Sequence, residues 1–195
     1  MKNYIFLSAL LFIISAGYDK NVEGYIVLPS NDTLHVHLKI ASGLFGGYDM
    51  NKKIKVADSS GAIVTYTPAD LAAYGYTENE KEYLYRSKPI KDSTLYFLKV
   101  VATGPKASLY AYYVTVGYGN SSSTKELYTF ERPDGAWLFL KNYDMLTTLR
   151  DKIKAFYGDT PALQEFIDKK FNRRGKIQDD ILAILEELNK SSGQN

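Results

Sequence analysis

Two histidines, His35 and His37, stand one residue apart in the stretch TLHVHLKI, and the chain has no others. Side chains at positions i and i+2 of a β-strand point to the same side, so the two imidazoles could bind one metal ion together. A zinc site would still need carboxylate ligands, because the chain has no cysteine. No acid stands at a defined spacing from the pair, and Lys39 on the same side would repel a cation. We therefore expect His35 and His37 to lie on a solvent-facing strand surface rather than to bind a metal.

Other catalytic patterns are missing from the sequence. There is no Gly-x-Ser-x-Gly motif, and any serine triad would have to use one of the same two histidines as its base. The glycine-rich and serine-rich stretches Ser42 to Asp49 and Gly117 to Glu126 lack the spacing of a phosphate-binding loop, so we interpret both as surface loops. Glycosidase chemistry needs two facing carboxyl groups, and 22 acidic residues offer no way to choose a pair. The sequence implies no cofactor.

Tyrosine is unusually abundant, with 17 residues. Four of them alternate on two predicted strands: Tyr83, Tyr85, Tyr110 and Tyr112. Exposed aromatic rings on a sheet could stack on sugars, which makes these four the candidate binding residues. The alternative is that tyrosine packs well on a half-buried β surface while its hydroxyl group reaches water.

The elements that would position these residues follow from periodicity. Leu34, Val36, Leu38 and Ile40 alternate with polar residues, which predicts a strand with one buried side, paired in a hairpin with residues 24–28. Further short runs rich in β-branched and aromatic residues, separated by turn signals, predict roughly nine strands in all between residues 24 and 140. Residues 65–76 contain a corner at Pro68 to Ala72. We expect an antiparallel meander that forms a barrel or a sandwich.

From residue 142 the pattern becomes helical. Residues 142–158 place Met145, Leu149, Ile153 and Phe156 on one side of a helix. Residues 159–171 carry a capping residue and then a proline in the first turn. Residues 177–190 have a wide apolar stripe and acids near the start. Helices this short need tertiary contacts, so we predict an α+β fold with about three C-terminal helices packed on the β-rich part.

The first residues resemble a secretory signal. Lys2 precedes an apolar stretch of about a dozen residues and the small residues Ser15, Ala16 and Gly17. That stretch is too short for a membrane span, which needs about 20 apolar residues, and without cysteine the chain cannot be a lipoprotein. We predict a signal peptide over residues 1–17, a β-rich domain over 18–141, a helical segment over 142–190 and a disordered tail over 191–195.

Several short motifs together resemble a group of exported bacterial proteins of unknown function. These motifs are an early hairpin around Asp32-Thr33, the corner Tyr66-x-Pro68-x-Asp70-Leu71 before Tyr74-Gly75-Tyr76, the strand Phe97-Leu98-Lys99-Val100, and the helical end with Phe156, Tyr157, Pro161 and Leu163. The resemblance implies an envelope location and a mixed α/β composition. It implies no catalytic residue, and the two histidines are not part of the shared pattern.

The charge of the chain argues against nucleic-acid binding. The formal net charge is +2, and no basic stripe with interleaved aromatics is present, so nucleic-acid binding is disfavoured. We expect a non-enzymatic binding or structural module of the periplasm or cell surface with a protein or glycan partner. The alternative is a hydrolase of envelope polymers that uses carboxylates or a metal centre at His35 and His37.

Overall fold

The computed structural model describes residues 20–41, 49–58, 60–90, 94–118, 121–140, 146–157, 161–170 and 177–190. The predicted signal peptide and C-terminal tail lie outside these ranges. Ten antiparallel strands form one sheet: β1 (Lys20–Val27), β2 (Thr33–Ile40), β3 (Ile54–Ala57), β4 (Ile63–Tyr66), β5 (Ala73–Glu78), β6 (Lys81–Ile90), β7 (Thr94–Ala102), β8 (Ser108–Tyr118), β9 (Ser121–Glu131) and β10 (Trp137–Phe139). Three helices follow: α2 (Leu146–Tyr157), α3 (Pro161–Lys170) and α4 (Ile177–Lys190). The predicted α+β class is confirmed.

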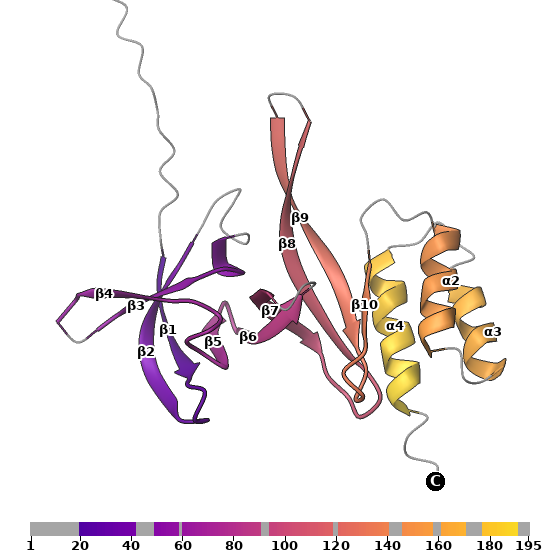
Figure 1. The fold of residues 1–195 in the computed structure, drawn as a ribbon, viewed down its shortest axis with the longest axis horizontal. Helices are drawn as coiled ribbons and strands as arrows, with labels where there is room; N and C mark the ends of the chain where they lie inside the picture. Colours follow the sequence, from indigo (N-terminus) through magenta and orange to yellow (C-terminus); the bar gives the residue numbers. More distant parts are fainter. Residues whose placement is uncertain are drawn as a thin grey trace, which may run out of the picture.

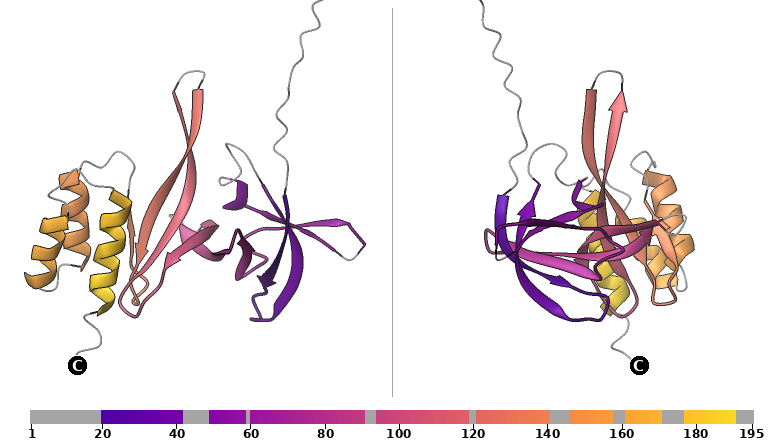
Figure 2. Two further views of the ribbon diagram at one scale, coloured as in Figure 1. Left: turned by 180° about the vertical axis from the view of Figure 1, so that it is seen from behind. Right: turned by 60° about the vertical axis from the view of Figure 1, so that its left-hand side comes forward.

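The sheet is open, with β4 and β10 at its two edges and the order β10-β9-β8-β7-β6-β5-β1-β2-β3-β4. It departs from a simple meander at one point, because β5 pairs with β1 instead of β4. The molecule is elongated: β1 to β5 curl together at one end, the β8–β9 hairpin projects from the middle, and the helices stand at the other end (Figures 1 and 2). The expectation of a closed barrel or a two-sheet sandwich therefore gives way to one curled open sheet.

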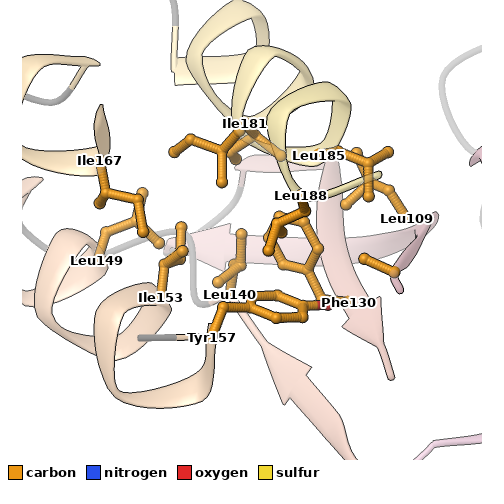
Figure 3. Close-up of a cluster of buried hydrophobic side chains, with 12 residues drawn as sticks. Leu109, Phe130, Leu140, Leu149, Ile153, Tyr157, Ile167, Ile181, Leu185 and Leu188 are labelled. Atoms are coloured by element: carbon orange, nitrogen blue, oxygen red, sulfur yellow. The ribbon is translucent and has the colours of Figure 1, made fainter. Parts of the chain in front are cut away.

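Two apolar clusters hold this sheet, and both lie on the same face, which we call the core face. The register places Leu38, Tyr74, Phe97 and Phe130 on this face. Every second residue along the paired strands lies on the same face as these four. The first cluster fills the curl of β1 to β6 and includes Phe97 of β7. The second joins β8 to β10 to the helices (Figure 3), with these fully or nearly buried side chains: Leu109, Phe130, Leu140, Leu149, Ile153, Tyr157, Ile167, Ile181, Ile184, Leu185 and Leu188.

The predicted helices are largely confirmed. α3 begins at Pro161, and Ile167 is its buried residue. In α2, Leu149 and Ile153 are buried as expected, and Tyr157 is buried beside the partly buried Phe156. Met145 lies outside the described residues. Among the described residues, none of the helices has both the length and the apolar composition that crossing a lipid bilayer requires.

A polar group lies on the core face between the two clusters. Lys99 Nζ contacts Glu126 Oε1 at 3.0 Å, and the same carboxylate accepts hydrogen bonds from Tyr113 (3.1 Å) and Tyr128 (2.8 Å). Burial of Glu126 favours its neutral form, but these partners outweigh it and lower the pKa of the carboxyl group. The half-buried Glu126 carboxylate therefore links β7, β8 and β9 through its bonds to Lys99, Tyr113 and Tyr128.

One predicted loop is in fact strand. β8 and β9 extend through most of residues 117–124, and Gly117 pairs with Ser122 while Tyr118 pairs with Ser121. The glycine and serine content suggested a loop, but pairing in a long hairpin outweighs this local preference. The other candidate loop, residues 42–48, lies outside the described residues.

Candidate functional site

The opposite face of the sheet, which we call the open face, carries the candidate site. The alternation that buries Leu38 and Tyr74 turns the intervening residues of β1, β2 and β5 to this face. His35 and His37 are both exposed there, as predicted. Leu38 and Ile40 are buried as expected, whereas Leu34 is 47% exposed because β3 pairs only with His37 to Lys39 of β2 and leaves the hairpin end uncovered.

A shallow hollow of about 520 Å³ lies on the open face across β1, β2 and β5. Its side chains come from residues on alternate positions of the three strands: Glu23, Tyr25, His35, His37 and Thr77. Gly24, Val36 and Tyr76 also line the hollow, although the register assigns these three positions to the core face. In register, Tyr25 stands opposite His35, and Glu23 stands opposite His37.

The Tyr25 ring lies across the neighbouring strand, over Gly75. A methyl group at Gly75 would lie 2.5 Å from both Cζ and the hydroxyl oxygen of Tyr25, so the ring occupies the place where a side chain would be. Gly75 is buried, and the Tyr25 ring shields it on this face. Burial and the nearby Glu82 carboxylate raise the pKa of Tyr25, so its hydroxyl group stays protonated and can donate a hydrogen bond.

The hollow combines an aromatic ring with hydrogen-bonding groups of several kinds. The imidazoles, the Glu23 carboxylate and the Thr77 hydroxyl group can donate to or accept from a polar ligand. In the described part of the chain, no three or more histidine, cysteine, aspartate or glutamate side chains are grouped so that they could hold a metal ion. The aromatic ring and these polar groups together suit a ligand with an apolar face and polar edges.

The four tyrosines proposed from the sequence are divided between the two faces. Tyr83 and Tyr85 lie on the core face, stacked on the tyrosines of β5: Tyr85 on Tyr74 with ring centres 4.6 Å apart, and Tyr83 on Tyr76 at 4.9 Å. Tyr85 is only 3% exposed, so its ring offers no free surface to a ligand. Alternation along β6 made both tyrosines candidates, but their cross-strand partners use the rings for packing.

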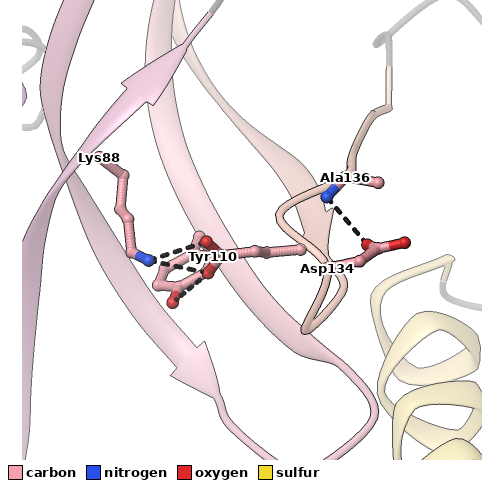
Figure 4. Close-up of polar contacts among 5 residues, drawn as sticks. Lys88, Tyr110, Asp134 and Ala136 are labelled. Atoms are coloured by element: carbon pink, nitrogen blue, oxygen red, sulfur yellow. Dashed lines mark hydrogen bonds and ion pairs between the residues drawn. The ribbon is translucent and has the colours of Figure 1, made fainter.

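Tyr110 and Tyr112 lie on the open face, at the other end of the sheet. Tyr110 is 1% exposed and donates a hydrogen bond to Glu131 Oε2 at 2.9 Å. Lys88 Nζ contacts both oxygens of that carboxylate, at 2.8 and 3.0 Å, and lies 5.7 Å from the centre of the Tyr110 ring (Figure 4). Burial and then the bond to Glu131 raise the pKa of Tyr110 to about 12. Tyr112 is half-buried.

A second hollow of about 280 Å³ borders Glu131, between the β7–β8 and β9–β10 turns. The turn between β9 and β10 is held by Asp134, which accepts a hydrogen bond from the Ala136 amide at 3.0 Å (Figure 4). Asp134 also accepts a hydrogen bond from Arg132. The hydrogen bond from Arg132 has the largest effect, and together these bonds lower the pKa of Asp134 to about 2. Glu131 and Asp134 are thus both bonded to protein groups.

Sequence reasoning identified the two histidines but missed Glu23, Tyr25 and Thr77. These three residues can be recognised only once β1 is known to pair with β5, because this pairing brings Gly75 beside Tyr25. An isolated glycine within a strand signals close approach of another group, and Tyr74-Gly75-Tyr76 carried that signal.

Comparison with protein-family models, with curated proteins and with solved structures finds no significant match to this chain. The resemblance to exported bacterial proteins therefore stays a prediction.

Proposed function

We propose that this chain is an exported, non-catalytic binding module of the cell envelope and that its ligand is a glycan, bound in the hollow at Tyr25. The position of the Tyr25 ring over Gly75, beside four polar side chains, carries the proposal. A sugar ring has apolar C–H faces and hydroxyl groups around its edge. An aromatic ring laid across a sheet, with hydrogen-bonding groups around it, complements both features.

Binding fits the hollow better than hydrolysis. Cleavage of a glycosidic bond requires two carboxyl groups facing one another across the substrate, and Glu23 is the single acid among the described residues that line the hollow. Glu131, at the other end of the open face, is bound by Lys88 and Tyr110. Export is part of the proposal, and the apolar stretch at residues 4–14 with Lys2 before it supports it.

A glycan array of envelope polysaccharides, followed by calorimetric titration of the strongest hit, tests the proposal. Tyr25→Ala is expected to weaken binding about tenfold or more, comparable with the ~1–3 kcal/mol that nucleobases gain from stacking on aromatic side chains. Tyr112→Ala is the matched control, because it removes a half-buried tyrosine from the far end of the same face, and it should leave the affinity unchanged.

Two results would refute the proposal. One is the absence of any glycan bound above background, and the other is an equal loss of affinity in both variants. Incubation of the bound oligosaccharide with the protein, followed by product analysis, separates binding from hydrolysis: shortened products would identify the chain as an enzyme.

A further inference from the structure

The turn between β5 and β6 fixes how the tyrosines of these two strands face each other. It has two residues, Asn79 and Glu80, and both have positive φ, 50° and 62°. This is the backbone geometry of the type I′ turn, which suits a two-residue hairpin because its twist matches that of the strands. The turn sets the register, so Tyr76 of β5 stands directly opposite Tyr83 of β6. Side chains at directly opposed positions are close enough to touch.

The hairpin holds two stacked pairs of tyrosines that differ in their access to solvent. The rings of Tyr76 and Tyr83 are 4.9 Å apart and inclined by 12°, and those of Tyr74 and Tyr85 are 4.6 Å apart and inclined by 8°. Tyr74 is fully buried, with the edge of the Phe97 ring against it. Tyr83 is half-buried at the margin of the first apolar cluster. Of the two pairs, that of Tyr76 and Tyr83 is therefore the one that solvent can reach.

Two ammonium groups lie near the Tyr83 ring. Lys81 Nζ is 5.4 Å from its centre, and Lys99 Nζ is 6.0 Å from it. Positive charge beside the ring opposes the build-up of further positive charge on it. If an oxidant removes an electron from Tyr83, the phenolic proton should therefore leave with it and give a neutral phenoxyl radical. Such a radical carries unpaired electron density on its oxygen and on its ortho carbons, which are the atoms that couple.

We propose that Tyr76 and Tyr83 are a site of oxidative modification and form a dityrosine cross-link when a haem peroxidase and hydrogen peroxide act on the chain. Each tyrosine loses one electron and its phenolic proton. The two radicals form a bond between ortho carbons, and each of these carbons then passes its proton to its own phenolic oxygen, which restores both aromatic rings. The peroxide takes up the two electrons and two protons and becomes two water molecules.

The cross-link would join β5, which carries Thr77 of the Tyr25 hollow, covalently to β6. The chain has no cysteine, so a disulfide cannot fill this role. The proposal is independent of glycan binding, because Tyr76 and Tyr83 stack on the core face, whereas the Tyr25 ring lies on the open face.

The test treats the full chain at low concentration with a haem peroxidase and limiting hydrogen peroxide. The blue fluorescence of dityrosine reports the reaction, and mass spectrometry after trypsin digestion locates it. Trypsin cuts after Lys81, between the two tyrosines, so the cross-link joins the fragments 56–81 and 82–86. We expect a product with the summed mass of these two fragments less two hydrogen atoms. Fragmentation of this product then shows that the linked residues are Tyr76 and Tyr83.

Two variants and one change of conditions complete the test. Tyr83→Phe keeps an aromatic ring for stacking but removes the phenol, so it should lose this product. Tyr112→Phe is the matched control, because Tyr112 is also half-buried but faces Leu127 instead of a tyrosine, and it should give as much product as the unmodified chain. In concentrated denaturant the register is lost, and the link between Tyr76 and Tyr83 should become no more frequent than links between other tyrosines.

Several results would overturn the proposal. These are oxidation of tyrosine without the joined fragments, a link between Tyr74 and Tyr85 in their place, and cross-links formed between separate molecules alone. An equal yield of the Tyr76–Tyr83 link in the folded and the denatured chain would overturn it as well, because the stacked geometry would then have no part in the reaction.

Discussion

Two glycines on adjacent, paired strands should respond very differently to the same added methyl group. At Gly75 the new Cβ would lie 2.5 Å from the end of the Tyr25 side chain, which can rotate away. The lost ring contact costs about 0.2–1 kcal/mol, and alanine regains roughly 0.5–1 kcal/mol over glycine within a strand. Gly75→Ala should therefore change the free energy of unfolding by less than about 1 kcal/mol while it displaces the ring from the hollow.

At Gly24 the clash is with groups that cannot move aside. The added Cβ would lie 2.4 Å from the Gly75 carbonyl oxygen and 2.7 Å from Leu38 Cδ1, so β1 and β5 would have to separate inside the first apolar cluster. The expected cost is about 3 kcal/mol, at the upper end for overpacking. For a chain of this size, that corresponds to a fall in Tm of roughly 6–12 °C.

Denaturant unfolding followed by circular dichroism measures both costs, and the m-value shows whether a two-state comparison holds. Glycan titration of the Gly75→Ala variant then measures the contribution of the ring, and we expect it to match the loss seen for Tyr25→Ala. The reasoning would be refuted if the two glycine variants lost equal stability, or if Gly75→Ala bound glycan as tightly as the unmodified chain.

Three further predictions concern the end of the sheet that carries the helices. Asn189 of α4 accepts hydrogen bonds from the amides of Lys106 (3.0 Å) and Ala107 (3.2 Å). Asn189→Ala should therefore lower the free energy of unfolding in denaturant by about 1–3 kcal/mol. An unchanged denaturation midpoint would contradict this role of Asn189. Ile153→Ala should lower the free energy of unfolding by about 2–5 kcal/mol, because the Ile153 side chain is fully buried between the helices and the sheet. Hydrogen exchange should then show faster opening of the helices around Ile153. Exchange as slow as in the unmodified chain would contradict this prediction. The raised pKa of Tyr110 favours its neutral form in the folded chain, so its contribution to stability is complete below pH 10 and is lost as the pH rises toward about 12; unfolding across this range should be less pH-dependent in Tyr110→Phe, and identical profiles would exclude the effect.

Much of the secondary structure follows from local patterns. The alternation around His35 and His37 identified β2 and placed both histidines on its exposed side. The proline at the start of α3 and the apolar stripe of α4 marked these helices. Local composition misled where strand pairing outweighed it, because the serine-rich half of the β8–β9 hairpin is strand. The stacking of Tyr85 on Tyr74 likewise depends on strand pairing.

The sequence by itself determined which residues of each strand share a side, because alternation is a local property of an extended backbone. It also determined that the histidines lack a third protein ligand at a defined spacing. Only the tertiary structure decided which strands are neighbours, because β1 could have paired in several ways and its choice of β5 depends on burial summed over the whole apolar cluster. That choice placed Tyr25 over Gly75 and turned two exposed histidines into part of a hollow.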